Sequence, residues 1–334
     1  MRKGILPLPE RLQPLALALL LAAPAAAQSV NSLAALQTAL DKAMPGDTIV
    51  LANGTYGGTA PINVARKGTK ERPIVIKAAS LGGAQIAGSG GFHMVAGAQY
   101  VTVWGFKLTH KSGGNKIDVG ATFNRFSHNL FQCQGRGSFL QCDGDDNEAD
   151  YNTFQHKNTE FQFIDVLGPG SKMAKRNWFH HNYFFDFQNS GANNSACIEL
   201  GYSGRSMDSS FTLIEWNLFV DCRGENEGAI CVKSGGAIIR YNTVGKGSTE
   251  ISIRHGNGSQ IYGNILMGTN GGLRFYGNDH LIYNNYFTDC SPAISLGNGK
   301  VQIPPGPLNE HDIPDRCQVV FNTLVNNRAN VTMI

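Results

Sequence analysis

The sequence contains no Cys-x-x-Cys pair, although it has seven cysteines. Closely spaced cysteine pairs are the usual mark of a structural zinc site, so zinc is not expected. The odd count and the length of 334 residues also argue against a disulfide framework. We interpret four of the cysteines as small buried residues, namely Cys222, Cys231, Cys290 and Cys317. Glycine motifs that cradle phosphate groups are missing as well, so the sequence gives no sign of a nucleotide-binding site.

The sequence also lacks a large excess of charge of either sign, because the formal net charge is only +3. Residues 1–27 have a basic start, an apolar core too short to span a membrane, and a small-residue end, which together predict a secretory signal peptide. Cleavage after Ala27 would remove three basic residues and one acidic residue, leaving a net charge of about +1. Such a balance gives little support to nucleic-acid binding. We expect an exported bacterial protein, periplasmic or secreted, in which residues 28–334 form one domain.

A short motif recurs along most of the chain: an aromatic residue or histidine, then Asn, one variable residue and an apolar residue. The copies are centred on Asn129, Asn152, Asn182, Asn217, Asn242, Asn284 and Asn322, with a weaker copy at Asn264. Most spacings lie near 21 to 25 residues. Longer gaps precede Asn182, Asn217 and Asn322, where we expect inserted loops.

A period this short, together with 40 glycines and short β-branched runs, predicts a solenoid in which each repeat forms one coil of strands. Apolar residues alternate within the runs, as in residues 101–106, so one face of each strand is expected to pack inward. The repeated Asn suits a turn, where its amide can stack on the Asn of the next coil. We therefore predict a right-handed parallel β-helix. A β-propeller would need a period about twice as long.

One segment is typical of a helix. Asn31 and Ser32 can cap a stretch with Leu33, Leu36 and Leu40 on one face, which Pro45 and Gly46 would end. We expect this amphipathic helix to cover the open N-terminal end of the core. No comparable cap is evident at the other end, where residues 331–334 resemble the middle of a strand. An incomplete C-terminus is therefore one of the alternatives that the sequence leaves open.

Residues 222–256 concentrate charges of both signs in a turn-rich stretch. Glu225 and Glu227 are two residues apart, so an extended strand would point both carboxylates to the same face, as an oxygen site for a hard cation. Lys233 and Arg254 are 21 residues apart, about one repeat, so we expect them side by side on neighbouring coils. An acid/base pair beside a cation suggests carbohydrate chemistry.

This stretch resembles polysaccharide lyase family 6, which is shared by alginate lyases and chondroitinase B. The matching segments are Gly224–Glu227, Lys233–Ser234, Asn242–Thr243, Arg254–Gly256 and Gly271–Gly277, preceded by Pro45–Val50, Asn53–Tyr56 and Lys67–Thr69. The resemblance runs from about residue 30 to the end of the chain. It implies a β-helical lyase that cleaves an anionic uronate polymer by calcium-assisted β-elimination, with alginate favoured over dermatan or chondroitin sulfate.

The resemblance also implies individual roles. The calcium ligands would be Asn193, Glu225 and Glu227, the general base Lys233 and the general acid Arg254, and the residues lining the substrate groove His255, Arg274 and Tyr276. A cation would stabilise the negative charge that develops on the substrate carboxylate when the neighbouring carbon loses its proton. The same cation and the charge of Arg254 would lower the pKa of Lys233 from about 10.4 towards the ~7 to 8 that suits a general base.

The sequence departs from the family pattern in two places. Lys233 lies one residue further from Glu227 than expected, and a bulge could absorb the inserted residue, for which Gly228 is the candidate. The stretch 193–201 lacks the glutamate and arginine expected there and contains Glu199 instead, so either Asn193 or Asn194 remains possible as the third calcium ligand.

Two other functions stay open. One is an inverting glycoside hydrolase using Asp145 and Asp146, which would need carboxylates on both sides of the bond. The other is a non-catalytic carbohydrate-binding protein. We interpret the acidic loop 143–146 as solvated, and the pair His180–His181 as structural, because adjacent strand residues point to opposite faces. A monomer is expected, and the sequence does not indicate mannuronate or guluronate preference.

Overall fold

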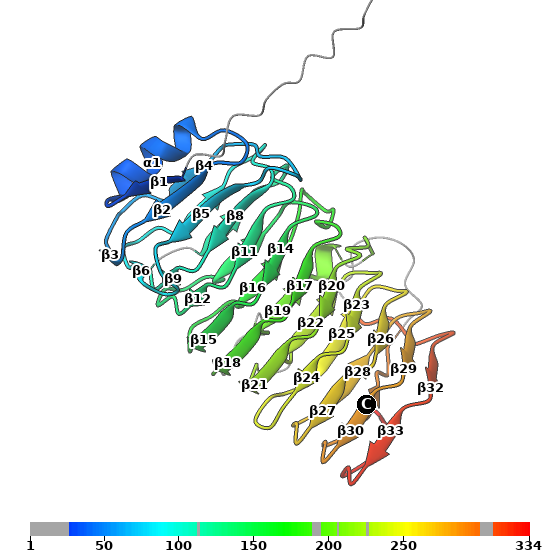
Figure 1. Ribbon diagram of the computed structural model, residues 1–334. Helices are drawn as coiled ribbons and strands as arrows, with labels where there is room; N and C mark the ends of the chain where they lie inside the picture. The colour runs from blue at the N-terminus through cyan, green and yellow to red at the C-terminus, as the bar shows by residue number, and fades with distance from the viewer. Residues whose placement is uncertain (1–26, 112–113, 189–194, 206, 225–226, 301–309) are drawn as a thin grey trace, which may run out of the picture.

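The computed structural model describes residues 27–111, 114–188, 195–205, 207–224, 227–300 and 310–334. The predicted signal peptide up to residue 26, and the predicted ligands Asn193 and Glu225, therefore lie outside the described residues. Three parallel sheets wind around one long core, and from the second strand onward the strands of the described chain fall in sheets A, B and C in turn (Figure 1). The parallel β-helix predicted from the sequence is confirmed.

In the part of the chain that the structure describes, sheet A contains twelve strands. They are β1 (Ala27–Val30), β2 (Thr48–Leu51), β5 (Ile74–Ala78), β8 (Val101–Trp104), β11 (Arg125–Ser127), β14 (Glu148–Asp150), β17 (Trp178–His180), β20 (Leu213–Glu215), β23 (Ile238–Arg240), β26 (Gln260–Tyr262), β29 (Leu281–Tyr283) and β32 (Gln318–Val320). Each strand pairs in parallel with the equivalent strands of the preceding and following coils, so the sheet runs the length of the molecule.

Sheets B and C contain eleven strands each among the described residues. Sheet B is formed by β3 (Gly54–Tyr56), β6 (Ala84–Ile86), β9 (Lys107–Leu108), β12 (Leu130–Phe131), β15 (Thr153–Lys157), β18 (Tyr183–Phe187), β21 (Leu218–Cys222), β24 (Thr243–Val244), β27 (Ile265–Met267), β30 (Tyr286–Thr288) and β33 (Thr323–Val325). Sheet C is formed by β4 (Ile62–Val64), β7 (Phe92–Met94), β10 (Asn115–Ile117), β13 (Leu140–Cys142), β16 (Ile164–Val166), β19 (Ile198–Leu200), β22 (Ile230–Lys233), β25 (Ile251–His255), β28 (Leu273–Phe275), β31 (Ile294–Leu296) and β34 (Val331–Met333).

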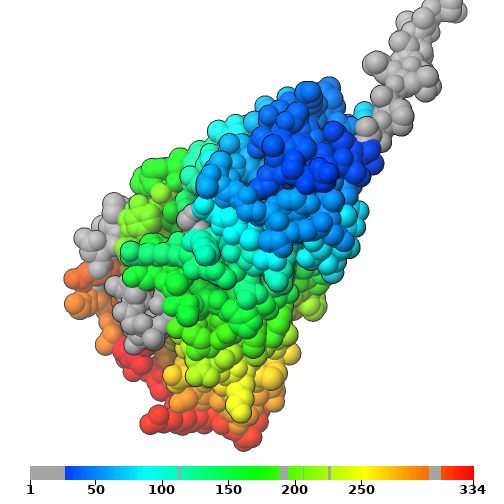
Figure 2. All heavy atoms as spheres, turned by 90° about the vertical axis from the view of Figure 1, so that its left-hand side faces the viewer, coloured from blue at the N-terminus to red at the C-terminus, as the bar shows by residue number. Residues whose placement is uncertain are grey.

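The core is built from the inward side of the strand alternation. Most strands place buried apolar residues at every second position, as their period of two requires. Equivalent positions on successive coils lie above one another, and Phe131, Phe154, Phe184 and Phe219 form a continuous stack with ring centroids 4.3, 5.0 and 4.6 Å apart. The space-filling view shows the coils following one another from the blue N-terminal end to the red C-terminal end (Figure 2).

The single α-helix of the described chain, α1 (Leu33–Lys42), lies at the N-terminal end as predicted (Figure 1). The Ser32 side chain caps it by accepting a hydrogen bond of 3.1 Å from the Ala35 amide. Leu36, Ala39 and Leu40 are buried against the first coil, so the helix covers the end of the core. No helix among the described residues is long and apolar enough to cross a membrane.

Each repeated Asn follows the corner between sheets A and B and bonds to the next coil. Asn217 accepts bonds from the Asn182 amide (2.9 Å) and side chain (3.1 Å), and donates 3.0 and 2.9 Å bonds to Asn242 Oδ1 and the Phe179 carbonyl. One predicted register is wrong by a residue: Asn285, not Asn284, bonds to Asn264, because Asn284 takes the corner position with φ of 52°.

The predicted cysteine environments are largely confirmed. All seven cysteines are free, and six of them are buried, including Cys222, Cys231 and Cys290. Cys317 is only half-buried, so that part of the expectation is wrong.

Candidate active site

The predicted site residues that the structure describes gather on and beside sheet C. The outward positions of β16, β19, β22, β25 and β28 align as one lateral row: Asp165, Glu199, Cys231, Ser252 and Arg274. Their neighbours along each strand point into the core. The row therefore places polar groups from five coils side by side on one face of the solenoid, over strands that the hydrogen-bonded ladder holds in place.

Lys233, at the end of β22, is held by two buried carboxylates. Its Nζ lies 2.5 Å from Glu199 Oε1 and 2.7 Å from Glu227 Oε1. Glu199 is 2% exposed and Glu227 is fully buried. Glu227 lies in a turn before β22, not in a strand, so the assumption that it shares a strand face with Glu225 is wrong. Sequence reasoning noted Glu199 only as a departure and did not place it against Lys233.

Arg254 occupies a bulge. Val232 pairs with Ile253, but Lys233 pairs with His255, so Arg254 is an extra residue in β25. Its Nη1 lies 3.2 Å from Glu227 Oε1, the same oxygen that Lys233 contacts. The expected lateral pairing of Lys233 with Arg254 is therefore wrong, although both side chains meet at Glu227. A bulge is thus present beside Lys233, but its extra residue, Arg254, lies in β25 and not in the strand that carries Lys233.

The charges around Lys233 shift its pKa in the direction opposite to the predicted one. Burial favours the neutral amine, but Cys231, Glu199 and Glu227 outweigh it, and the pKa of Lys233 is raised above its ordinary value. The sequence predicts a lowered pKa, which is the opposite direction, because it does not reveal two carboxylates at Nζ. Burial, together with the charge of Glu227, raises the pKa of Glu199 to about 7 despite the opposing effect of Lys233.

The predicted groove residues fall into two contact groups. His255 is buried, with Nε2 3.3 Å from Ser203 Oγ, and its ring lies 5.1 Å from that of His311. Tyr276 stacks on the other side of His311, with ring centroids 4.1 Å apart. His311 was not predicted, because it lies beyond the last segment that resembles the family, Gly271–Gly277, and no spacing connects it to the site.

Arg274 belongs to the second group, where it lines a cleft of about 730 Å³. Its Nη2 lies 2.6 Å from Glu250 Oε1 and 3.1 Å from Ser252 Oγ. Burial raises the pKa of Glu250, against the charges of Arg274 and Arg254. The cleft lies where sheet B strands turn into sheet C, and it is lined by Arg223, Gly224, Gly228, Gly247, Ser248, Thr249, Glu250, Gly268, Asn270 and Arg274.

The model of the chondroitinase B family matches residues 30–333. The chain belongs to this family. Its fold is also that of solved polysaccharide lyases. The family 6 alginate lyase AlyGC is 25% identical, with a TM-score of 0.77, over 86% of this chain and 42% of that lyase. The chain thus spans less than half the length of AlyGC. Among proteins with curated functions, none matches this chain.

Two further lyases have the same fold at lower identity. A mannuronic acid-specific family 6 lyase from human gut microbiota is 24% identical, with a TM-score of 0.79, over 91% of this chain and 78% of that one. A family 6 polysaccharide lyase from Pseudopedobacter saltans is 22% identical, with a TM-score of 0.75, over 87% and 74% of the two chains.

The donor set in this family member fits a hard cation. Oxygens of Glu199 and Glu227 lie within 4.8 Å of one another and of Cys231 Sγ. Two buried carboxylates supply the charge and the oxygen ligands that Ca²⁺ prefers, whereas a thiol is a poor ligand for it. Lys233 Nζ, a positive group between the two carboxylates, stands in the place such an ion would take. The residues present would therefore hold calcium through Glu199 and Glu227.

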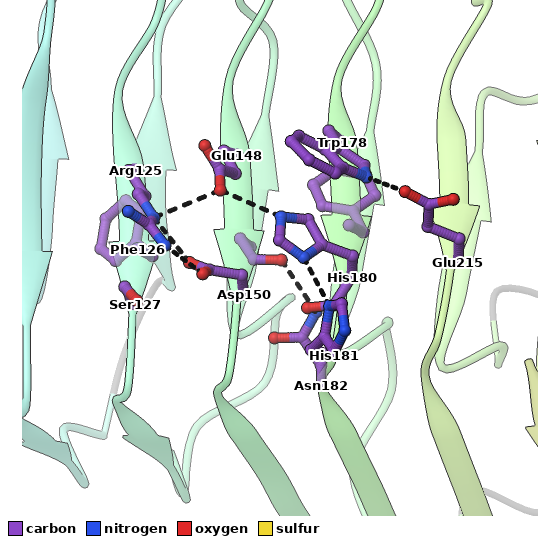
Figure 3. Close-up of polar contacts among 12 residues, drawn as sticks. Arg125, Phe126, Ser127, Glu148, Asp150, Trp178, His180, His181, Asn182 and Glu215 are labelled. Atoms are coloured by element: carbon purple, nitrogen blue, oxygen red, sulfur yellow. Dashed lines mark hydrogen bonds and ion pairs between the residues drawn. The ribbon is translucent and has the colours of Figure 1, made fainter.

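A second polar cluster lies on the outer face of sheet A (Figure 3). His180 Nε2 is 3.0 Å from Glu148 Oε1, and Arg125 binds Glu148 and, through two nitrogens, Asp150. His180 Nδ1 is 2.8 Å from His181 Nδ1. The assumption that these two histidines point to opposite faces is wrong, because His181 takes a corner conformation with φ of 52°. Arg125 balances the carboxylates, consistent with the structural role predicted for the histidine pair.

The acidic loop is solvated only in part, since the Asp145 side chain is 42% exposed and that of Asp146 21% exposed. Asp145 accepts a 2.8 Å bond from the Lys175 amide, and Asp146 binds the Arg176 guanidinium through two 2.7 Å bonds. Asp143 is buried, which raises its pKa. The carboxylates of Asp145 and Asp146 are thus engaged with basic residues of the next coil, which leaves the hydrolase hypothesis without an available acid pair in this loop.

The buried His255 makes stability sensitive to acid. Burial, followed by His311, Arg254 and Lys233, lowers its pKa from 6.5 to about 3. As the pH falls below about 6.5, His255 binds a proton in the unfolded chain but not in the folded chain. The free energy of unfolding therefore decreases as the pH falls. We expect His255→Gln to reduce the slope of unfolding free energy against pH by up to about 1.4 kcal/mol per unit between pH 6 and 4. Urea denaturation at several pH values measures this slope. An unchanged slope would contradict the neutral state of His255.

Proposed function

We propose that this chain is an exported lyase that cleaves the uronate polymer alginate by calcium-assisted β-elimination. One observation carries the proposal: Lys233 and Arg254, the base and acid implied by the family, both contact Oε1 of Glu227, the implied cation ligand. A base, an acid and a cation ligand that meet at one carboxylate are the three elements that this reaction needs.

The roles of the residues follow from where the charge moves. A cation held by the buried carboxylates would neutralise the substrate carboxylate while the adjacent ring carbon loses its proton. Lys233 Nζ is the group placed to accept that proton. The electrons form a carbon–carbon double bond as the bond to the glycosidic oxygen breaks, and Arg254 donates to that oxygen. The buried His255, whose pKa is lowered, stays neutral and adds no charge to the groove.

Alginate is the proposed polymer because several solved lyases that are similar to this chain are named for it. AlyGC is described as an alginate lyase, another family 6 alginate lyase was solved with a trisaccharide, and the alginate lyase AlyF-OU02 was solved with G6. In this chain, Arg223 and Arg274 at the cleft offer positive charge to a polyanion. A substrate of carboxylate-bearing sugars would match that charge.

The test is ultraviolet absorbance at the wavelength of unsaturated uronates. Full-length protein is mixed with mannuronate-rich alginate, guluronate-rich alginate and dermatan sulfate, with and without a chelator. We expect absorbance to rise when the protein is mixed with alginate. The rate of this rise should be at least about 100-fold lower when the chelator removes the cation. New reducing ends without absorbance would indicate a hydrolase instead. Absorbance that the chelator leaves unchanged would contradict the role of calcium.

A non-catalytic, carbohydrate-binding function is the second candidate. It is favoured by the ion pairs of Lys233 with Glu199 and Glu227, which stabilise the charged ammonium and so oppose its role as a base. Polymer that stays intact while it is retained by the folded protein would support this candidate.

A further inference from the structure

We infer that Glu199 is a ligand of the bound cation in this chain, and that the cation and the Lys233 ammonium compete for the same place between Glu199 and Glu227. The inference rests on the proposed calcium site. It adds a ligand that the family resemblance does not supply, because Glu199 lies in the stretch where the sequence departs from the family pattern.

The distances carry the first step. Lys233 Nζ lies 2.5 Å from Glu199 Oε1 and 2.7 Å from Glu227 Oε1. Calcium binds carboxylate oxygens at about 2.3 to 2.6 Å. An ion at the position of Nζ would therefore be at or near bonding distance from both oxygens with little movement of either side chain. One position cannot hold both the ammonium and the ion.

The orientation of the carboxylates carries the second step. Each carboxylate directs Oε1 to Lys233 and has its other oxygen fixed by a neutral donor. Gln162 Nε2 donates to Glu199 Oε2, and the Ser195 amide donates to Glu227 Oε2 at 2.8 Å. Neither neutral donor would repel a cation. The two Oε1 atoms are thus held in advance facing one central position, as a built site requires.

The charge balance carries the third step. Glu199 and Glu227 are almost fully buried, and an unpaired buried carboxylate is costly. In this structure the ammonium of Lys233 and the guanidinium of Arg254 supply the balancing charge. A divalent ion would supply it equally well and would displace the Lys233 ammonium from its position between the two carboxylates. Cation binding would thus both fill the site and release the proposed base.

The sheet A cluster provides a contrast. Arg125 there contacts Glu148 and, through two nitrogens, Asp150, and a planar guanidinium in this arrangement is hard to replace with one ion. Lys233 offers a point charge at a single position instead. The competition is therefore inferred only for the sheet C site.

The experiment is calorimetric titration of metal-stripped, full-length protein with CaCl₂, which reads binding without any activity. Compared with wild type, Glu199→Gln should bind Ca²⁺ at least about 10-fold more weakly, because it removes one charged ligand. Lys233→Met should bind at least about 10-fold more tightly, because charge-assisted bonds to the competing ammonium are gone. Glu215→Gln is the matched control. It removes a buried carboxylate of sheet A that pairs with Arg240, away from the proposed site, and its affinity should stay within about 2-fold of wild type.

The outcomes separate this inference from the proposed function. Wild-type binding that Glu199→Gln leaves unchanged would overturn the role of Glu199 and leave the calcium lyase intact. An affinity that does not rise in Lys233→Met would overturn the competition, and this variant decides the matter if Glu199→Gln does not fold. No binding by wild type, with chelator-resistant cleavage of alginate, would overturn the calcium site itself.

Discussion

Replacing Lys233 with methionine is expected to lower the rate of unsaturated-product formation on alginate by about 10²- to 10⁴-fold, the usual contribution of a positioned general base. Methionine keeps the apolar stem of the side chain and removes only the proton-accepting amine. Lys233 is 7% exposed at the end of β22, and its ordered contacts give the amine one defined position beside Arg254 and Glu227. The loss should appear in kcat, because the amine acts on the reacting carbon.

Initial rates of ultraviolet absorbance at saturating alginate and calcium measure this effect. Lys116→Met is the matched control, because Lys116 lies on the same outer face of sheet C, at β10, and is 42% exposed. Its rate should stay within about 3-fold of wild type. The proposal fails if the Lys233 variant is folded, binds calcium and retains a wild-type rate. Because the same substitution should tighten calcium binding, lost activity could not be blamed on a lost cation.

The Asn217→Ala variant is expected to lose about 3 kcal/mol or more of unfolding free energy, since it leaves several buried groups without partners. The Asn182 amide and the Phe179 carbonyl each lose a 2.9 Å bond, and Asn242 Oδ1 loses one of its donors. All three groups belong to neighbouring coils, so one substitution interrupts the ladder in both directions. Water cannot readily replace these bonds, because Asn217 is almost fully buried.

Urea denaturation monitored by circular dichroism measures the loss as a lower midpoint at an unchanged slope. Asn158→Ala is the control, because Asn158 is exposed on the outside of a coil, and it should change the unfolding free energy by less than about 0.5 kcal/mol. Equal midpoints for the two variants would show that the ladder does not stabilise the solenoid.

Local signals in the sequence were sufficient for the fold. The Asn repeat, the alternation in strands such as Val101–Trp104 and the Ser32 cap each act within a few residues, and each is found as predicted. The error at Asn284 has a physical cause. Two asparagines in succession both suit a corner, and only the fit to the neighbouring coil decides which one enters the ladder.

The site could be predicted less completely, because its contacts join distant parts of the chain. Glu199 contacts Lys233, which is 34 residues away in the sequence. His311 stacks on His255 from beyond the last segment that resembles the family. The bulge at Arg254 depends on pairing between two strands, which no single stretch of sequence records. Lys233, Arg254 and Glu227 could be read from the sequence as candidate site residues, whereas the contact of Glu199 with Lys233 could not.

The asparagine ladder lies at the corner between sheets A and B, whereas the proposed site lies on and beside the outer face of sheet C. Stability and chemistry therefore depend largely on different residues of each coil. A lineage with this architecture can change the groove, as at Glu199, with little effect on the ladder that keeps its coils in step. Such a separation favours the spread of new polymer preferences among descendants that keep the same scaffold.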